Sequence, residues 1–185
     1  MTDPPGTNNT LSVLLTSTSS DAHSWNLVVL ELALGELGAN VRNLGPCAPE
    51  ELVVDAARLQ RPGLIVVSSV NGHGCQDGLR LIPKLRAATG TGPAAPDIII
   101  GGKLGITGRV HIDRTNALLQ AGFDAVFEGG TLDDLAAYVA ALHARRSAAA
   151  APLAVRSQRS AERGPTTVRA ATRALVRTRQ PRTAP

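Results

Sequence analysis

Asp21 and His23 are the residues of this sequence whose types and spacing most directly suggest chemistry. In an extended segment, two residues at this spacing can face the same side. Histidine is the commonest metal ligand among side chains, and a ligating imidazole usually donates its other ring N–H to a carboxylate. One histidine supplies too few ligands for a zinc site made by the protein alone. The pair predicts either a metal already held in a macrocycle, or a helix-capping Asp21 beside an ordinary surface His23.

Three further segments, 68–74, 101–108 and 128–131, combine glycines with small hydroxyl residues. Such residues leave room for a bulky group and let a ligand approach the backbone, although each segment read alone also fits an ordinary glycine-bearing turn. The phosphate-binding pattern GxxxxGK[ST] is absent, and segment 17–24 contains no glycine that could begin a GxGxxG motif. We therefore expect a long slot at these segments and find little support for nucleotide binding.

Alternating apolar runs and helical patterns predict the elements that position these segments. An uninterrupted apolar run such as Leu64–Val67 is typical of a parallel strand buried on both faces. We expect an α/β fold of the flavodoxin-like or Rossmann-like type, with a doubly wound five-stranded parallel sheet of order 2-1-3-4-5 and a ligand at the carboxyl ends of its strands. The predicted strands are 11–16, 41–44, 64–67, 97–100 and 124–127, and the predicted helices are 25–37, 49–61, 76–88, 113–120 and 132–144.

Charge divides the chain into a body and a tail. Residues 145–185 hold ten arginines and one acidic residue, whereas residues 1–144 carry a net charge of −5. We expect a disordered N-terminus at 1–10, a folded domain at 11–144 and a disordered basic tail at 145–185, because the tail has too little apolar material to form a core. The tail is a solvated extension or, alternatively, binds an acidic partner or nucleic acid. The acidic body argues against nucleic-acid binding by the domain.

Other classes of protein are disfavoured by simple features. No uncharged apolar run approaches the ~20 residues of a membrane span, so no membrane association is expected. The polar start of the chain lacks the pattern of a secretory signal. Cys47 and Cys75 are far apart and fit neither a CxxC site nor a disulfide framework. A reducing, cytoplasmic setting is expected.

Three motifs, each after a predicted strand, together resemble a known family. Asp21-x-His23, Ser68-x-Val70 and the doublet at 101–102 are similar to the DxHxxG, SxL and GG motifs of the cobalamin-binding domain of B12-dependent enzymes. The resemblance covers roughly residues 11–143 and is closest to the small subunits of glutamate mutase. The chain departs from the family pattern at Asn26, where the family has glycine, and at Val70, where leucine is usual.

The resemblance implies roles for the matching residues. His23 would be the lower axial ligand of cobalt in place of the cofactor's own dimethylbenzimidazole, and Asp21 would hold the other ring nitrogen. Residues at four strand ends would surround the cofactor, and none would be catalytic. These are Ser20, Ala22 and Ser24 beside His23; Ser68, Ser69 and Val70 along the slot for the nucleotide tail; Gly101, Gly102, Lys103, Leu104, Gly105, Ile106 and Thr107 against the tail and corrin edge; and Gly130 and Thr131 on the far side.

The resemblance also implies an activity and a partner. The chain would be the cobalamin subunit of an isomerase, an adenosylcobalamin-dependent mutase that converts L-glutamate to 3-methylaspartate. A (β/α)₈ substrate barrel needs about 250 residues, more than the whole chain, so a separate large catalytic subunit would complete the enzyme. The alternatives are a non-enzymatic cobalamin carrier or B12-responsive regulatory module, and a flavodoxin-like domain for another ligand.

Overall fold

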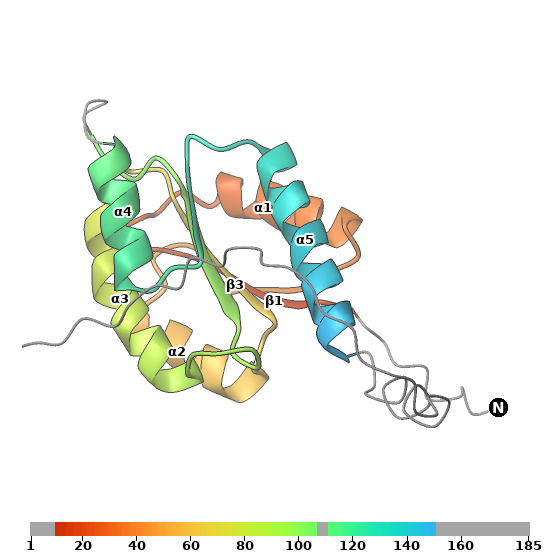
Figure 1. Ribbon diagram of the computed structural model, residues 1–185. Coiled ribbons are helices and arrows are strands. Elements are labelled where there is room, and N and C mark those ends of the chain that lie inside the picture. The colour runs from red at the N-terminus through yellow and green to blue at the C-terminus, as the bar shows by residue number, and fades with distance from the viewer. Residues whose placement is uncertain (1–9, 107–110, 151–185) are drawn as a thin grey trace, which may run out of the picture. The chain divides into compact units, whose positions relative to one another are not determined.

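The computed structural model describes residues 10–106 and 111–150, except for the side chains of residues 111, 149 and 150. Five parallel strands form one sheet of order β2-β1-β3-β4-β5, which confirms the predicted flavodoxin-like topology (Figure 1). The strands are β1 (Ser12–Ser17), β2 (Asn40–Asn43), β3 (Leu64–Ser69), β4 (Asp97–Gly102) and β5 (Ala125–Glu128).

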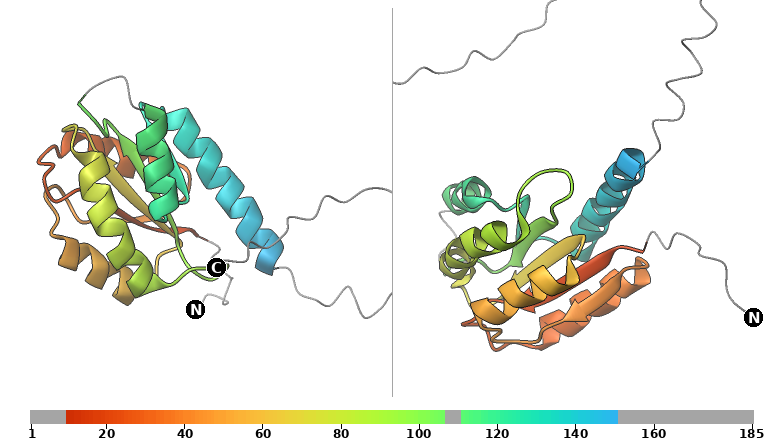
Figure 2. Two further views of the ribbon diagram at one scale, coloured as in Figure 1. Left: turned by 60° about the vertical axis from the view of Figure 1, so that its left-hand side comes forward. Right: turned by 90° about the horizontal axis from the view of Figure 1, so that it is seen from below.

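Helices cover both faces of the sheet. Figure 2 shows α2, α3 and α4 on one face and α1 and α5 on the other. Each face has its own apolar core, with Leu81 of α3 in one and Leu34 of α1 in the other. The helices are α1 (Trp25–Glu36), α2 (Glu50–Gln60), α3 (Gly74–Thr89), α4 (His111–Ala121) and α5 (Leu132–Ala150).

The central strand β3 is buried along its whole length. Ile65 and Val67 belong to the core beneath α2, α3 and α4, and Leu64 and Val66 belong to the core beneath α1 and α5. This alternation follows from the two-residue period of a strand, and burial on both faces explains the uninterrupted apolar run.

Two strands extend beyond their apolar runs. Ser68 pairs in register with Gly101, and Ser69 pairs with Gly102, so these small residues continue β3 and β4. Because parallel strands end at one edge of the sheet, the extensions of β3 and β4 bring the serines and glycines next to each other. The serines and glycines predicted to line the slot are therefore part of the strands themselves, at the carboxyl end of the sheet.

Helix α5 continues to Ala150, past the predicted boundary at 144. Arg145 lies 2.7 Å from Asp97, and Arg146 donates to the carbonyl of Gly63 at 2.9 Å. These contacts give the last turns of the helix partners on the body, although both arginines belong to the segment predicted to be disordered.

The rest of the predicted disordered segments, 1–9 and 151–185, lies outside the described residues. The sheet falls within one compact unit, Met1–Ala148, and the second unit, Ala149–Pro185, is described only for the last two residues of α5. Among the described helices, none has the length and apolar character needed to cross a membrane.

Candidate cofactor-binding site

The Asp21 and His23 side chains form a hydrogen-bonded pair in the segment that joins β1 to α1. Oδ1 of Asp21 lies 2.7 Å from Nδ1 of His23 and accepts the backbone N–H of His23 at 3.0 Å. The Asp21 side chain is fully buried, whereas 61% of the His23 side chain is exposed. The imidazole is therefore exposed to solvent, and the carboxylate that supports it is buried.

Hydrogen bonds keep this buried carboxylate ionised. Burial alone raises the pKa of Asp21, but donation from the backbone N–H groups of Val70 and His23 and from the His23 ring outweighs burial and lowers the pKa below its ordinary value. An ionised carboxylate only accepts hydrogen bonds, so Nδ1 of His23 carries a proton toward Asp21, and in the neutral ring the lone pair is on Nε2. Within the described part of the chain, Nε2 has no hydrogen-bond partner, so in the neutral ring it can serve as a metal ligand.

Neighbouring segments fix the loop that carries the pair. The backbone carbonyl of Asp21 accepts the N–H of Cys47 at 2.9 Å. The Asn71 side-chain amide donates to the carbonyl of Ser20 at 2.8 Å, and the Ser20 hydroxyl donates to the buried carboxylate of Asp77. The position of the imidazole is therefore set by the β2–α2 segment, the β3–α3 segment and α3.

A mostly apolar cavity of about 280 Å³ lies between α1 and α5, at the ends of β3, β4 and β5. It adjoins the histidine loop through Val70, which lines it and whose N–H holds Asp21. Its polar side chains are few, and among them the Asn26 amide donates to the Ser68 hydroxyl at 2.7 Å. Oδ1 of Asn26 is buried without a hydrogen-bond partner. The lining side chains include Asn26, Val29, Leu30, Val66, Ser68, Val70, Ile99, Phe127, Thr131, Leu132 and Leu135.

Glycines keep the β4 side of this cavity open. Gly102 has φ +107°, which favours glycine, and a Cβ there would collide with the carbonyl oxygen of Ser69. A Cβ at Gly101 would lie 3.2 Å from Cβ of Phe127. The doublet therefore brings bare backbone to the cavity wall, where a ligand can approach it closely.

The structure brings most of the sequence-predicted site residues to this edge of the sheet. Ala22 and Ser24 are exposed beside His23, and Ser20 anchors the same loop. Lys103 and Ile106 are exposed in the segment after β4. The predicted residues that line the cavity are Ser68, Val70, Gly101, Gly102, Gly130 and Thr131, and Gly105 is half-buried.

Ser69 and Leu104 lie on the opposite face of the sheet. A Cβ placed on Gly74, the first residue of α3, would meet both side chains at 2.8 Å, and Leu104 belongs to the core beneath α2, α3 and α4. Their side chains are therefore turned away from the cavity, and a role for either in binding stays a prediction. Thr107 lies outside the described residues.

Three residues that position the histidine loop are absent from the sequence-based assignment: Cys47, Asn71 and Asp77. Asn71 falls inside the predicted 68–74 segment and could have been found as a polar residue after a buried strand. In the sequence, Asp77 is explained by its place in the first turn of a helix, where an acidic residue is favourable. Its contact with Ser20 depends on the tertiary fold, because the two are 57 positions apart.

Within the described ranges, no group of three or more histidine, cysteine, aspartate or glutamate side chains is placed to hold a metal ion. His23 can therefore contribute one ligand to a metal whose other ligands come from a bound group. A macrocycle-held metal fits this donor set, and the adjoining apolar cavity fits a flat appendage of such a group.

Comparisons with known proteins place the chain in a family, although no family model matches it. It is 34% identical over 123 residues to glutamate mutase sigma subunit 1 of Haloarcula marismortui, a match that covers 65% of this chain and 77% of the relative. It is 30% identical over 122 residues to the glutamate mutase sigma subunit of Treponema denticola, covering 65% of this chain and 85% of the relative.

Solved structures support the same fold. The methanol:cobalamin methyltransferase complex MtaBC from Methanosarcina barkeri matches with a TM-score of 0.56 at 19% identity, over 72% of this chain and 46% of that chain. At this identity the likeness concerns the fold alone. The sequence matches extend over most of each relative's length. The chain therefore belongs to the family of glutamate mutase sigma subunits.

Proposed function

We propose that this chain binds cobalamin, in the adenosyl form, as the small subunit of a glutamate mutase. The observation that carries the proposal is the exposed imidazole of His23, which is supported by Asp21 in a loop that adjoins an apolar cavity through Val70. The names of the relatives, glutamate mutase sigma subunits, support the same function.

His23 would hold the cobalt through Nε2. The buried Asp21 carboxylate keeps the proton on Nδ1, fixes the orientation of the ring and increases its basicity as a ligand. When bound, adenosylcobalamin supplies a cobalt–carbon bond that breaks homolytically to start radical chemistry. The chain's contribution is to bind and orient the cofactor.

The cavity between α1 and α5 would take the displaced nucleotide tail. The doublet Gly101-Gly102 provides bare backbone along one wall, and Asn26 and Ser68 provide polar groups at the edge of the sheet. The unpartnered Oδ1 of Asn26 is an acceptor for a hydroxyl or amide N–H of the bound group. Asn26 would thus contribute a hydrogen bond where a glycine would contribute none.

Conversion of L-glutamate to 3-methylaspartate would require a separate large catalytic subunit. A substrate barrel of about 250 residues does not fit within this chain. The His23 side chain is exposed, so a partner would have to cover the bound cofactor to exclude water from the reacting groups. The proposed enzyme is therefore a hetero-oligomeric isomerase.

Cofactor binding by histidine variants tests this proposal. Methylcobalamin is mixed with the purified chain, and the protein-bound fraction is measured by gel filtration and absorption spectroscopy. We expect wild type to retain cofactor with the spectrum of a nitrogen-ligated corrinoid. We expect His23→Ala either to lose the cofactor or to hold it with the spectrum of a corrinoid that lacks a lower nitrogen ligand.

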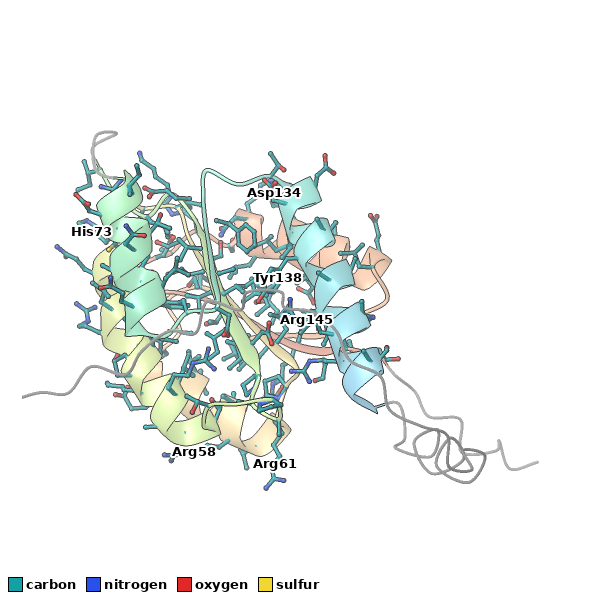
Figure 3. All side chains as sticks on the ribbon, in the orientation of Figure 1. Arg58, Arg61, His73, Asp134, Tyr138 and Arg145 are labelled. Atoms are coloured by element: carbon teal, nitrogen blue, oxygen red, sulfur yellow. The ribbon has the colours of Figure 1, made fainter. Side chains whose placement is uncertain are left out.

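His73→Ala is the matched control, because His73 is also exposed at the start of a helix. Figure 3 shows His73 beside α3 and α4, away from α1 and α5. This variant should bind like wild type. A His23→Ala protein that binds methylcobalamin with an unchanged affinity and spectrum would contradict the proposal.

A further inference from the structure

A hollow of about 240 Å³ lies at the edge of the sheet where the strands begin. It is lined by the start of β1, by the turn Arg61-Pro62-Gly63 before β3, and by His143 and Arg146 of α5. Because β1 and β3 are parallel, their carboxyl ends, which carry the proposed cofactor site, lie at the opposite edge. This Arg146 hollow therefore shares no lining residue with the cavity between α1 and α5.

Two buried nitrogen atoms beside the Arg146 hollow have no hydrogen-bond partner among the described residues. They are Nε of Arg146 and Nε2 of His143, which lie three positions apart and therefore on the same face of α5. A guanidinium keeps all its protons, so Nε of Arg146 is always a donor. A buried donor without an acceptor lowers stability, and it indicates a ligand that accepts hydrogen bonds.

The backbone holds the Arg146 guanidinium in place. Nη2 of Arg146 donates to the carbonyl of Gly63 at 2.9 Å and to the carbonyl of Ala95 at 3.2 Å. Nη2 also lies 4.0 Å from the Asp97 carboxylate, but that carboxylate is shared with Arg145, which is 2.7 Å away. Two arginines and one carboxylate leave an excess of positive charge, so the surroundings of the fixed Nε–H favour an anion.

The Arg61 backbone adopts a conformation that costs an arginine more than a glycine. Arg61 ends α2 in the left-handed region, with φ +47°, although the Pro62 that follows it favours an extended conformation. A glycine would make this turn at a lower cost. The arginine is therefore better explained by what its side chain does than by the turn, and that exposed side chain lines the Arg146 hollow.

Arg61 also lines a neighbouring hollow of about 430 Å³, the Arg58 hollow, whose other lining residues include Arg58 and Thr89. Figure 3 shows Arg58 and Arg61 at the lower end of the fold. Among the described residues that line the two hollows, three are arginines, one is a histidine and none is acidic. Positive charge is therefore concentrated at this edge, although residues 1–144 carry a net charge of −5.

We infer that this edge of the sheet binds a phosphate group, with Arg61 and Arg146 as its cationic partners and His143 as a further donor. Guanidinium groups bind phosphate oxygens through charge-assisted hydrogen bonds, and their planar arrangement of N–H groups matches the phosphate geometry. The two hollows share Arg61, so they also fit two linked phosphate groups. The inference goes beyond the proposed function and does not depend on it.

Titration calorimetry of the full chain tests this inference with two probes, inorganic phosphate and pyrophosphate, at constant ionic strength. Arg61→Gly should weaken binding of the tighter probe by at least about tenfold, because hydrogen bonds between charged groups are the strong ones. The variant should fold, since glycine is favoured at φ +47°. Arg146 is kept in this test because its loss would also remove its bonds to Gly63 and Ala95.

Arg42→Ala is the matched control. Arg42 is exposed on β2 and lines neither hollow, so this change removes the same charge from a different place. It should bind both probes like wild type, and binding to arginines elsewhere on the chain would be the same in the two variants. His23→Ala should also bind both probes like wild type, which separates this site from the proposed cofactor site.

Each outcome decides for or against the phosphate site. Weaker binding in Arg61→Gly than in Arg42→Ala supports it. Tighter binding of pyrophosphate than of phosphate then assigns the ligand to both hollows, and the opposite order assigns it to the Arg146 hollow. No binding of either probe by wild type, or equal affinities of Arg61→Gly and Arg42→Ala, overturns the inference and leaves the proposed function intact.

Discussion

The backbone N–H of Val70 lies 2.5 Å from Oδ2 of Asp21, and this hydrogen bond links the end of β3 to the loop that carries His23. Asp21 uses its other carboxylate oxygen for the His23 ring. Two motifs that are 49 positions apart in the sequence therefore act as one support for the imidazole. Val70 contributes its backbone to this support, so its side chain remains free to line the cavity.

Replacement of Asp21 by asparagine should weaken cobalamin binding by about 10- to 100-fold, the usual effect of losing a partner that orients a metal ligand. The new side-chain amide has one acceptor oxygen, so its NH₂ group would face either the N–H of Val70 or the two N–H groups of His23. The dissociation constant is measured by quenching of Trp25, the only tryptophan, which is 77% exposed two residues after His23. Asp133→Asn, an exposed change on α5, is the control. Equal affinities for the two variants would contradict the role of Asp21.

The same carboxylate should make stability depend on pH. The pKa of Asp21 in the folded chain is below its ordinary value of 3.8, because hydrogen bonds favour the ionised form. Its contribution to stability is therefore complete above the unfolded pKa, and it is lost as the pH falls through the folded pKa. Urea unfolding should show a gap between wild type and Asp21→Asn that is constant near neutral pH and narrows in acid below pH 3.8. A gap that does not change with pH would contradict this assignment.

Gly102→Ala should destabilise the chain by at least about 1–3 kcal/mol, because alanine is strained at φ +107° and its Cβ would collide with the carbonyl oxygen of Ser69. Gly35→Ala is the matched control, since Gly35 lies within α1 with no atom near its would-be Cβ. That change should stabilise the chain by about 0.5–1 kcal/mol. Urea unfolding measures both. If the two variants shift stability in the same direction, the close packing at Gly102 is not what restricts it to glycine.

Mutase activity should require a second protein. The purified chain with adenosylcobalamin should produce no detectable 3-methylaspartate from L-glutamate, because a substrate barrel of about 250 residues is longer than this chain. Addition of a glutamate mutase large subunit should start turnover, and His23→Ala should abolish it. Product is measured by chromatography. Turnover by the chain alone would contradict the proposed division of labour.

The fold could be predicted because its signals are local. The apolar run at 64–67 is the sequence pattern of a doubly covered strand, and β3 is buried on both faces. The end of α5 could not be predicted, because Arg145 and Arg146 read as part of a basic tail. Their partners, Asp97 and Gly63, come from distant parts of the chain.

The candidate site could be predicted as a set of strand ends, but the direction of some side chains could not. Strand alternation places Ser68 toward the cavity and Ser69 toward α3, a distinction that requires knowing that β3 extends past its apolar run. The contact between Ser20 and Asp77 required the tertiary fold. The local sequence pattern therefore predicts which segments lie at the edge of the sheet. Which of their side chains face the cavity depends on the tertiary packing.

Electron paramagnetic resonance of the cobalt(II) form tests the central claim, that Nε2 of His23 ligates the metal. The chain is prepared once at natural isotope abundance and once with ¹⁵N-labelled histidine, and cob(II)alamin is added to each. We expect the nitrogen splitting of the cobalt lines to be a triplet in the unlabelled protein and a doublet in the labelled protein. The labelled His23→Ala variant should show no doublet. A triplet that persists in the labelled protein would mean that the cofactor's own base remains the ligand, and would contradict the account.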